Sequence, residues 1–425
     1  MNVNKTTGSK KRCELAATLM VVCQLMLIFS GCGGFSVRGG DTTAVERETS
    51  EKSDFSRDVE QWVDSVLEKM TLREKVGQLV MPALYARSDS STMKMLRFYV
   101  DSLHVGGILL LKGDVESARG IADAVYAGSK VPMFISIDAE WGLGMRLEDA
   151  PSFPRNGNIS DEVDENIMYD YGREVARECR LTGINMVLGP VVDVNSAKGE
   201  SSVIGTRSFG GDARKVAGFG TAYSQGLEDG NIISVAKHFP GHGGTEIDSH
   251  KLMPRLERSR MELEQEDLVP FREYISRGLS GIMVGHLSVP ALDSVNRPAA
   301  FSPVIIDGFL RDEMGFEGLV LTDALNMKGS EGRMAVDAIK AGADVVMAPQ
   351  NTGEEIERIL LDVERGNLSE LEIREHCRRI LFYKYIVARD RNVAEKGSGE
   401  LHNDYTRELL HRLGGKKNQR RPLSE

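Results

Sequence analysis

Short apolar runs recur along the chain, and each is followed by a polar loop and a segment with amphipathic helical spacing. The runs are nearly continuous rather than alternating, which is typical of parallel strands covered on both faces. Eight strand–helix units in about 300 residues favour a (β/α)8 barrel of the TIM type, an α/β fold, over an open doubly wound sheet. No Gly-x-Gly-x-x-Gly turn follows the first run, which argues against a dinucleotide site. The predicted strands are Val76–Pro82, Gly107–Leu111, Met133–Asp138, Ile184–Pro190, Ile232–His238, Gly281–Gly285, Gly318–Thr322 and Asp344–Ala348.

Helix signals surround this repeat and set the limits of the predicted domain. Helical spacing covers residues 59–70, and Thr71 with Glu74 forms a capping-box pattern for the next turn. Residues 353–390 have the pattern of closing helices, the second of which begins at Ser369 with Glu372 at the matching position. We therefore predict a single catalytic barrel domain over residues 56–390. A polar C-terminal tail follows over residues 391–425, with one short helix-like stretch near Tyr405–Leu413.

The N-terminus resembles a secretion signal of the bacterial lipoprotein type. Four basic residues between positions 5 and 12 precede an apolar run from Leu15 to Phe29, and small residues lead directly to Cys32. This pattern predicts a signal peptide over residues 1–31, a lipid on Cys32 and a polar tether over residues 32–55. The alternative is an uncleaved anchor, for which the apolar run is short. We expect a membrane-anchored protein on the periplasmic or surface side of the cell envelope.

Charge and cysteine content narrow the classes of partner. The formal net charge is −10, and residues 1–31 carry +3, so the remainder of the chain carries −13. An acidic excess of this size argues against a nucleic-acid partner. Beyond Cys32 only Cys179 and Cys377 remain, too few for a disulfide framework. No obligate protein partner is implied by these features.

The densest group of titratable side chains follows the fifth predicted strand. Lys237, His238, His242, Asp248 and His250 lie within fourteen residues that also contain one proline and three glycines. Proline and glycine end a regular element, so these side chains belong to a strand end and a loop. Such crowding costs stability and is typical of a functional site.

Other polar residues follow other predicted strands. Because the carboxyl ends of barrel strands meet on one rim, these side chains are expected to converge there with the group at 237–250. The additional residues are Asp138, Arg146, Asp193, Asn195, Arg207, His286 and Asp323.

Several of these residues also have purely structural interpretations. Asp193 and Asn195 suit a turn, and His286 suits a hydrogen-bonded position in the wall of the barrel. His242 lies between glycines and suits an exposed position. Asp323 suits either a helix N-cap, with a helix starting at residues 324–327, or a carboxylate placed to attack the anomeric carbon of a sugar. The sequence pattern does not separate these two interpretations.

Several segments match, in order, the motifs of a known family. They are Lys-His-Phe-Pro-Gly-His-Gly at 237–243 with Asp-Ser-His at 248–250, Arg-Ser-Phe-Gly at 207–210, Pro-Val-Val-Asp at 190–193, and Thr-Asp-Ala-Leu at 322–325. With these motifs the chain resembles glycoside hydrolase family 3, and within it the β-N-acetylhexosaminidase branch. The resemblance runs from about Val66 to Ala348, which is most of the predicted barrel.

The resemblance implies a role for each matching residue. Asp323 is similar to the nucleophile that forms a covalent glycosyl-enzyme in a retaining mechanism. His250 is similar to the general acid/base, which Asp248 orients, on a loop whose glycines permit movement. No cofactor is implied. Binding of the terminal sugar is implied for Asp138, Arg146, Arg207, Lys237 and His238.

One segment departs from the branch. The branch usually has Asp-Gln-Glu-Gly-Gly-Arg-Val after its third strand, whereas this chain has Asp-Ala-Glu-Trp-Gly-Leu-Gly at 138–144. Asp138 and Arg146 keep their relative spacing. Trp141 replaces a glycine and is expected to add an aromatic surface near the sugar, and Leu143 replaces an arginine. The choice between N-acetylglucosamine and glucose is therefore open.

Our functional hypothesis is an exo-acting β-N-acetylglucosaminidase that removes terminal sugars from glycans or peptidoglycan fragments. Alternatives are a phosphorylase, since a histidine acid/base tolerates an incoming phosphate anion, a β-glucosidase of the same family, and a binding lipoprotein without activity. A metal site built from His238, His242, Asp248 and His250 is disfavoured, because Pro240 breaks the helix that such spacing would need. We therefore predict no metal.

Overall fold

The computed structural model describes residues 42–195, 204–245, 254–325, 334–389 and 400–414, with side chains from residue 55 onward. It divides into two units, residues 1–68 and 69–425, which are treated separately. The first unit is represented by helix α2, Thr42–Lys69. This helix contains the predicted helical stretch 59–70 except for its last residue, and it also extends into the segment predicted as a tether.

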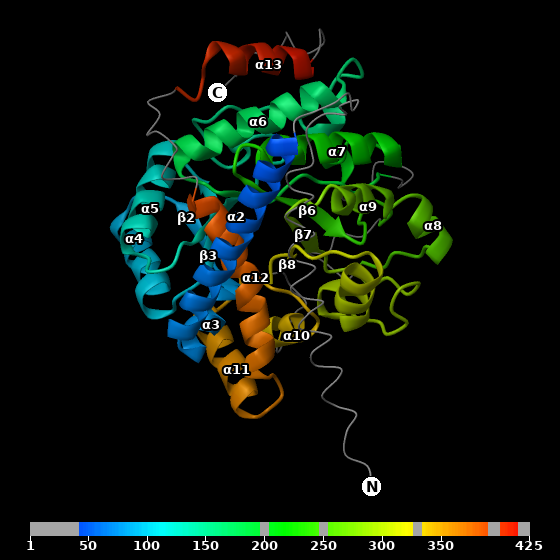
Figure 1. The fold of residues 1–425 in the computed structure, drawn as a ribbon. Coiled ribbons are helices and arrows are strands. Elements are labelled where there is room, and N and C mark those ends of the chain that lie inside the picture. The colour runs from blue at the N-terminus through cyan, green and yellow to red at the C-terminus, as the bar shows by residue number, and fades with distance from the viewer. Residues whose placement is uncertain (1–41, 196–203, 246–253, 326–333, 390–399, 415–425) are drawn as a thin grey trace. The chain divides into compact units, whose positions relative to one another are not determined.

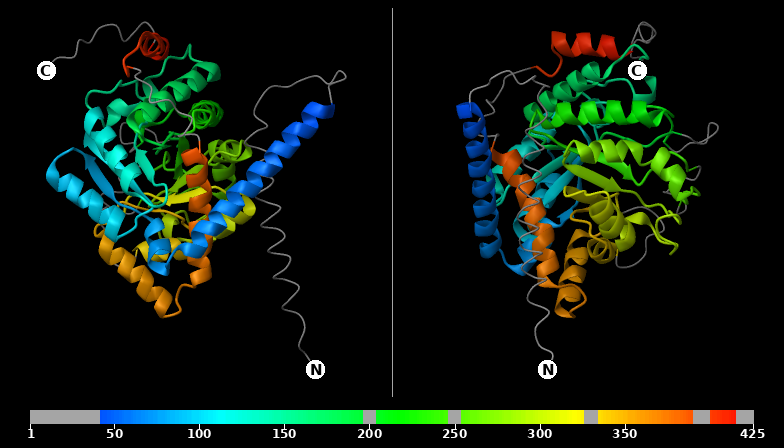
Figure 2. Two further views of the ribbon diagram at one scale, coloured as in Figure 1. Left: turned by 60° about the vertical axis from the view of Figure 1, so that its left-hand side comes forward. Right: turned by 45° about the vertical axis from the view of Figure 1, so that its right-hand side comes forward.

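The second unit is built on parallel strands. Seven of them form one sheet in the order β2-β3-β4-β5-β6-β7-β8, and every pairing between described strands is parallel. In Figures 1 and 2 the strands lie at the centre of this unit with the helices outside them. The strands are β1 (Val80–Met81), β2 (Ala83–Ala86), β3 (Gly107–Gly113), β4 (Phe134–Ile137), β5 (Met186–Val187), β6 (Ile233–Phe239), β7 (Gly281–Val284), β8 (Leu319–Thr322) and β9 (Val346–Met347).

Two short contacts close the sheet into a ring. β1 pairs with β9 through Val80 and Val346, and a bridge between Leu321 and Val345 joins β9 to β8. β1 and β2 are one extended segment interrupted by Pro82, which has no N–H to donate to a ladder. The predicted (β/α)8 barrel is therefore confirmed. Each of the eight predicted strands overlaps one described strand, but residues 76–78 of the first belong to α3, and β2, which follows Pro82, was not predicted.

Helices connect the strands and cover the ring. The predicted stretch at 405–413 forms α13, whose Leu409 and Leu413 are buried. The helices of this unit are α3 (Leu72–Gln78), α4 (Ser90–Arg97), α5 (Val115–Gly128), α6 (Glu165–Thr182), α7 (Ala213–Glu228), α8 (Arg260–Gln265), α9 (Val269–Ser276), α10 (Met334–Lys340), α11 (Thr352–Glu364), α12 (Glu370–Arg389) and α13 (Asp404–Gly414), with shorter or π-helical turns η1 (Phe98–Ser102), η2 (Leu143–Met145), η3 (Asn156–Asn158), η4 (Gly205–Arg207), η5 (Ala299–Phe301) and η6 (Val304–Glu313).

Both predicted capping boxes are present. The N–H of Glu74 donates to Thr71 Oγ1 at 3.2 Å, and the N–H of Thr71 donates to the Glu74 carboxylate at 2.8 Å. Ser369 and Glu372 exchange the same two bonds at 3.1 and 2.7 Å. Each box satisfies backbone donors that a helix start would otherwise leave unpaired. The capping signals therefore fixed where α3 and α12 begin.

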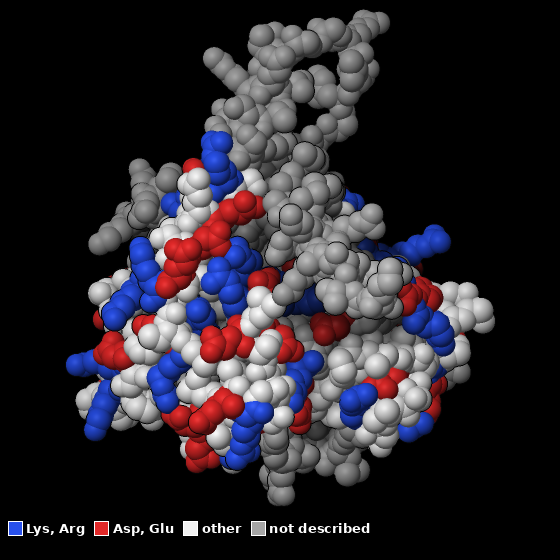
Figure 3. Space-filling view, turned by 60° about the horizontal axis from the view of Figure 1, so that its bottom comes forward, with Lys and Arg blue, Asp and Glu red and all other residues white. Residues whose placement is uncertain are grey.

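Burial agrees with the near-continuous apolar runs. Every residue of β4, β6, β7 and β8 is buried, as expected for strands covered on both faces. Cys179 and Cys377 are both buried free thiols. None of the helices within the described ranges has the length and apolar character needed to cross a membrane. On the face drawn in Figure 3, Lys and Arg are interspersed with Asp and Glu, unlike the continuous basic surface that nucleic acid requires.

Candidate active site

A cavity of about 340 Å³ lies at the carboxyl ends of the strands. Ala83, Leu109 and Met283 contribute apolar walls from β2, β3 and β7. Barrel enzymes hold their catalytic groups at this end, because loops that follow different strands meet there. The charged and imidazole side chains that line the cavity are Asp138, Glu140, Arg146, Arg207, Lys237, His238, His242 and Asp323.

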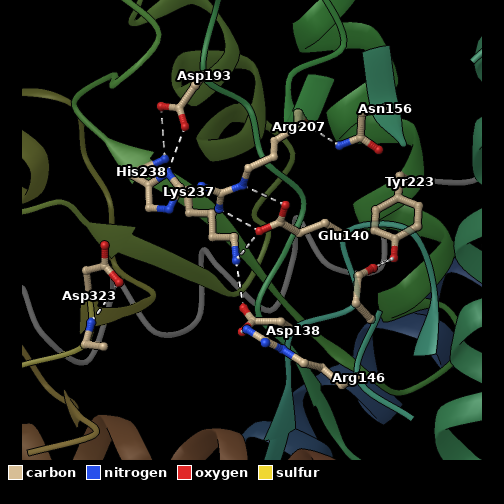
Figure 4. A network of polar contacts seen from close by, with 12 residues as sticks. Asp138, Glu140, Arg146, Asn156, Asp193, Arg207, Tyr223, Lys237, His238 and Asp323 are labelled. Atoms are coloured by element: carbon tan, nitrogen blue, oxygen red, sulfur yellow. Dashed lines mark hydrogen bonds and ion pairs between the residues drawn. The ribbon is translucent and has the colours of Figure 1, made fainter. Parts of the chain in front are cut away.

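Lys237 is the buried centre of this polar group. It lies on β6 with a side chain that is 3% exposed, and Nζ is 2.8 Å from Asp138 Oδ1 and 2.9 Å from Glu140 Oε1 (Figure 4). Burial alone would lower the pKa of the Lys237 ammonium, but Asp138 and Glu140 outweigh it and raise the pKa above its ordinary value. Lys237 is therefore a cation at neutral pH.

Glu140 joins Lys237 to Arg207. Its carboxylate accepts from Arg207 Nε at 2.9 Å and from Nη2 at 2.7 Å, the two-pronged geometry that makes arginine–carboxylate pairs strong. Burial opposes the Glu140 charge, but Lys237 and Arg207 hold the pKa of Glu140 well below its usual range. The Asn156 amide donates to the Arg207 carbonyl at 2.7 Å, which fixes the backbone of η4.

Glu140 was absent from the residues predicted from sequence. One available signal was that the glutamate of the branch motif is retained two positions after Asp138, although the residues on both sides of it changed. Its side chain is 1% exposed, so its function depends on tertiary pairing that local sequence patterns do not specify. The structure adds Glu140 to the candidate site.

Asp138 lies at the end of β4, between two cations. Oδ1 accepts from Lys237, and Oδ2 accepts from Arg146 Nη2. Burial opposes the Asp138 charge, but Lys237 and Arg146 outweigh it and lower the pKa. The Asp138 and Arg146 side chains are 14% and 25% exposed, more than Lys237 at 3%. These two side chains therefore present charged, hydrogen-bonding groups to the cavity.

Asp193 holds the turn that carries the two histidines. Its fully buried carboxylate is 2.7 Å from His238 Nδ1 and accepts the backbone N–H groups of His238 and His242 at 3.2 and 2.7 Å. Burial opposes its charge, but His238 outweighs it and lowers the pKa of Asp193. An ionised carboxylate accepts a hydrogen bond, so Nδ1 of His238 carries a proton. Asp193 thus orients the imidazole that lines the cavity.

One of the structural interpretations made from sequence is wrong. His242 is 3% exposed rather than solvent-facing, and its Nδ1 is 2.6 Å from Thr245 Oγ1. Burial lowers the pKa of His242. By strict geometry neither ring nitrogen of His286 has a hydrogen-bond partner among the described residues, but backbone groups of Asp323 and Ala324 act on its pKa against the lowering by burial, so its role as a hydrogen-bonded wall residue stays a prediction. Its ring also contacts Phe301, with the ring centroids 5.4 Å apart.

Asp323 follows β8 and lines the cavity. Its Oδ1 accepts the N–H of Ala324 at 2.7 Å, and its own N–H donates to the Val284 carbonyl at 3.0 Å. Burial opposes the Asp323 charge, but His238 and His286 outweigh it and lower the pKa of Asp323. An ionised carboxylate is the form that a nucleophile requires. The predicted helix start continues into 326–333, outside the described residues, so the N-cap interpretation stays a prediction.

Some predicted residues fall outside the described part of the chain. Asp248 and His250, the predicted acid/base pair, lie within 246–253, and Cys32 precedes residue 42. The metal-ligand set that the sequence disfavoured includes both Asp248 and His250. Among residues that the structure describes, no three His, Cys, Asp or Glu side chains are grouped so as to hold a metal ion.

The expected aromatic surface at Trp141 is not in the cavity. Trp141 is not one of the described residues that line it, and the Arg155 guanidinium lies 4.7 Å from the Trp141 ring centroid. Leu143 is fully buried. Trp141 and Leu143 are therefore not among the described residues that line the cavity, while Asp138, Glu140 and Arg146 are.

The geometry can be compared with known proteins. The model for the Glycosyl hydrolase family 3 N terminal domain matches residues 71–382, which includes every element from α3 to β9. The chain belongs to glycosyl hydrolase family 3. It is thus an enzyme of the glycoside hydrolase class.

Known proteins are similar to this chain over much of its length. A β-hexosaminidase from Nitrosospira multiformis is 34% identical over 262 residues, which cover 58% of this chain and 74% of the relative. A protein of Cellulomonas fimi named β-N-acetylglucosaminidase/β-glucosidase is 29% identical over 337 residues, 76% of this chain and 59% of the relative. The structure of a family 3 β-N-acetylglucosaminidase from Paenibacillus sp. str. FPU-7 superposes with a TM-score of 0.75 at 34% identity, covering 81% of this chain and 68% of that one.

Replacing Glu140 tests whether its buried ion pairs with Lys237 and Arg207 are needed for stability and activity. Glu140→Ala leaves Arg207 without its carboxylate and Lys237 with Asp138 alone, so we expect a loss of about 3 kcal/mol in the free energy of unfolding. Displacement of both cations should also lower kcat/KM by about 100-fold for an aryl β-N-acetylglucosaminide. Glu148→Ala, which removes an exposed carboxylate from the same loop, is the matched control and should leave both quantities unchanged. Wild-type kcat/KM in Glu140→Ala would contradict this account.

Proposed function

We propose that this family 3 protein is an exo-acting, retaining β-N-acetylglucosaminidase that removes terminal β-linked N-acetylhexosamine from glycans or peptidoglycan fragments. The observation that carries the proposal is the cavity in which the paired charges of Asp138, Lys237, Glu140 and Arg207 lie beside the ionised carboxylate of Asp323. The names of the Nitrosospira and Paenibacillus relatives support the choice of sugar.

The charged lining suits a polar, uncharged ring. Asp138 and His238 offer acceptors or donors to hydroxyl groups, and Arg146 and Arg207 offer N–H donors to hydroxyl or acetamido oxygen atoms. The charges of Asp138, Lys237, Glu140 and Arg207 largely neutralise one another through ion pairs, so the site carries fixed dipoles rather than a net field. Such pre-formed pairs favour the binding of an uncharged hexosamine in one orientation over the binding of an anion or a cation.

The chemical step proceeds in two halves. Asp323 attacks the anomeric carbon, and the C1–O bond to the leaving sugar breaks as His250 delivers a proton to that oxygen. Water then attacks C1 of the glycosyl-enzyme, loses a proton to His250 and releases Asp323 with the original β configuration. Asp323 is suited to the first half because its pKa is lowered, which keeps the carboxylate ionised.

A β-glucosidase is the second candidate within the same family, because the Cellulomonas fimi relative carries both activities in its name. The two sugars differ at C2, where N-acetylglucosamine has an acetamido group and glucose has a hydroxyl. Discrimination between them therefore depends on donors near C2, and a site built to bond the acetamido group would reject the sugar that lacks it.

The proposal is tested with paired aryl substrates. We expect kcat/KM for the aryl β-N-acetylglucosaminide to exceed that for the aryl β-glucoside, with the β anomer as the first product. Asp323→Asn should lower kcat by about 1,000-fold or more, because the amide is a poor nucleophile. Asp312→Asn, an exposed aspartate, is the control. A preference for the glucoside, or full activity in Asp323→Asn, would contradict the proposal. N-acetylglucosamine 1-phosphate as the main product in phosphate buffer would identify a phosphorylase instead.

We also propose that the chain is a lipoprotein of the cell envelope, acylated at Cys32 and acting in peptidoglycan turnover. The support is the sequence alone: basic residues, an apolar run from Leu15 to Phe29 and small residues before Cys32. Wild-type protein and Cys23→Ala should incorporate labelled palmitate in a bacterial host, whereas Cys32→Ala should not. Label of wild-type intensity on Cys32→Ala would contradict the assignment.

A further inference from the structure

The two carboxylates that pair with Lys237 lie on either side of Ala139. Asp138 precedes Ala139 in the chain, and Glu140 follows it. The Ala139 carbonyl accepts the N–H of Gly142 at 3.2 Å, which places Glu140 inside a tight turn. Gly142 has a φ of 84°, a left-handed backbone conformation that favours glycine. The shape of this turn therefore sets the separation of the two carboxylates.

A tyrosine from a distant helix holds the same carbonyl. Tyr223 lies on α7 and is 2% exposed, and its hydroxyl donates to the Ala139 carbonyl at 3.1 Å (Figure 4). A carbonyl oxygen only accepts hydrogen bonds, so the direction of this bond is fixed. Burial raises the pKa of the Tyr223 hydroxyl well above its ordinary value, so the proton stays on it. The turn is thus anchored to α7 as well as to its own loop.

Close packing fixes the position of Tyr223. α6 approaches α7 at Gly172, where a Cβ would lie 2.1 Å from the Tyr223 carbonyl oxygen. The Tyr223 ring packs against Tyr171 with the ring centroids 4.9 Å apart, and Tyr171 packs against Phe153 at 4.6 Å. The N–H of Phe153 donates to the Trp141 carbonyl at 2.9 Å. The three rings therefore form a buried cluster that is joined to the turn at two points.

Tyr223 acts on the site only through this turn. It is not among the described residues that line the cavity. A shift of the Ala139 carbonyl would move Glu140, whose carboxylate is 2.7 Å from Arg207 Nη2 and 2.9 Å from Lys237 Nζ. Hydrogen bonds weaken steeply when their distance and angle depart from the preferred values. A small displacement of the turn therefore reaches the charged lining of the cavity.

We propose that Tyr223 is a positioning residue for the glycosidase reaction: its hydroxyl fixes the turn at Ala139, which places Asp138 and Glu140 for their ion pairs and for the terminal sugar. The nucleophile Asp323 follows β8, and neither of its described hydrogen bonds involves this turn. Loss of the Tyr223 hydroxyl should therefore weaken binding of the sugar more than it slows the chemical step. This inference rests on the proposed glycosidase function.

The test removes one hydroxyl and keeps the aromatic ring. In the full-length protein, Tyr223→Phe should raise KM for an aryl β-N-acetylglucosaminide by about fivefold, the usual net value of one hydrogen bond, and leave kcat within about twofold of wild type. The inhibition constant of N-acetylglucosamine should rise by the same factor, because the monosaccharide uses the same binding groups. Thermal unfolding measured in parallel shows whether the variant is folded at the assay temperature.

Tyr171→Phe is the matched control. Tyr171 belongs to the same aromatic cluster and is 1% exposed, but its hydroxyl has no hydrogen-bond partner among the described residues. Removal of this hydroxyl should change neither KM nor the inhibition constant. Equal rises in the two variants would assign the effect to packing of the cluster and would overturn the inference.

A double variant separates positioning from a general loss of stability. The effect of the Tyr223 hydroxyl passes largely through Glu140, so it should shrink when that carboxylate is absent. Tyr223→Phe should therefore raise KM by less than about twofold when it is added to Glu140→Ala. Effects that simply multiply in the double variant would contradict a positioning role.

The proposed function and this inference fail in different ways. Turnover of the aryl β-N-acetylglucosaminide by wild type, with unchanged KM and inhibition constant in Tyr223→Phe, would overturn the positioning role and leave the glycosidase activity standing. Absence of turnover by wild type would overturn the proposed function, and the inference that rests on it.

Discussion

The ammonium group of Lys237 is the feature on which the candidate site depends. A charge buried to this degree is strongly unfavourable unless it is paired, and here it is paired with both Asp138 and Glu140. Each carboxylate has in turn a second cation, Arg146 for Asp138 and Arg207 for Glu140. Removal of either carboxylate would leave three cations with a single carboxylate in a buried region. The three cations and two carboxylates therefore form one unit rather than independent pairs.

The barrel explains how these groups come together. Asp138 and Glu140 follow β4, while Lys237 lies on β6, so the ammonium reaches past the end of the intervening β5. Arg207 belongs to η4, in the long connection between β5 and α7. Closure of the ring through β1, β9 and β8 holds the strand ends at fixed separations, and buried strands leave little freedom for adjustment. Fixed strand ends permit hydrogen bonds of 2.7 to 2.9 Å between residues far apart in sequence.

Much of the fold followed from local patterns. Near-continuous apolar runs identified eight of the nine described strands, and the capping boxes at Thr71 and Ser369 identified two helix starts, because both signals depend on residues close in sequence. The same patterns did not predict β2, which follows Pro82, and they assigned residues 76–78 of helix α3 to a strand. Nor did they extend α2 toward Thr42, in a polar segment without an apolar stripe.

Most residues of the site could be predicted from the sequence, but their pairing and burial could not. Motif order and strand ends identified Asp138, Lys237 and Asp323, all of which line the cavity. Glu140 was missed because its importance arises from pairing with Lys237 and Arg207 in three dimensions. The burial of His242 was missed because glycine neighbours suggest exposure, whereas its hydrogen bonds to Asp193 and Thr245 keep it inside. Long-range pairing of polar groups is what residue patterns leave undetermined.

The central claim is that Asp323 becomes covalently bonded to the sugar within a site organised by Lys237. The most direct measurement is mass spectrometry of the protein after rapid acid quenching during turnover of a slow N-acetylglucosaminide, followed by proteolysis. The account predicts that the peptide containing Asp323 gains the mass of one N-acetylhexosaminyl group, and that fragmentation assigns the group to that carboxylate. A glycosyl group on a different residue, or an unmodified Asp323 peptide under steady turnover, would contradict it.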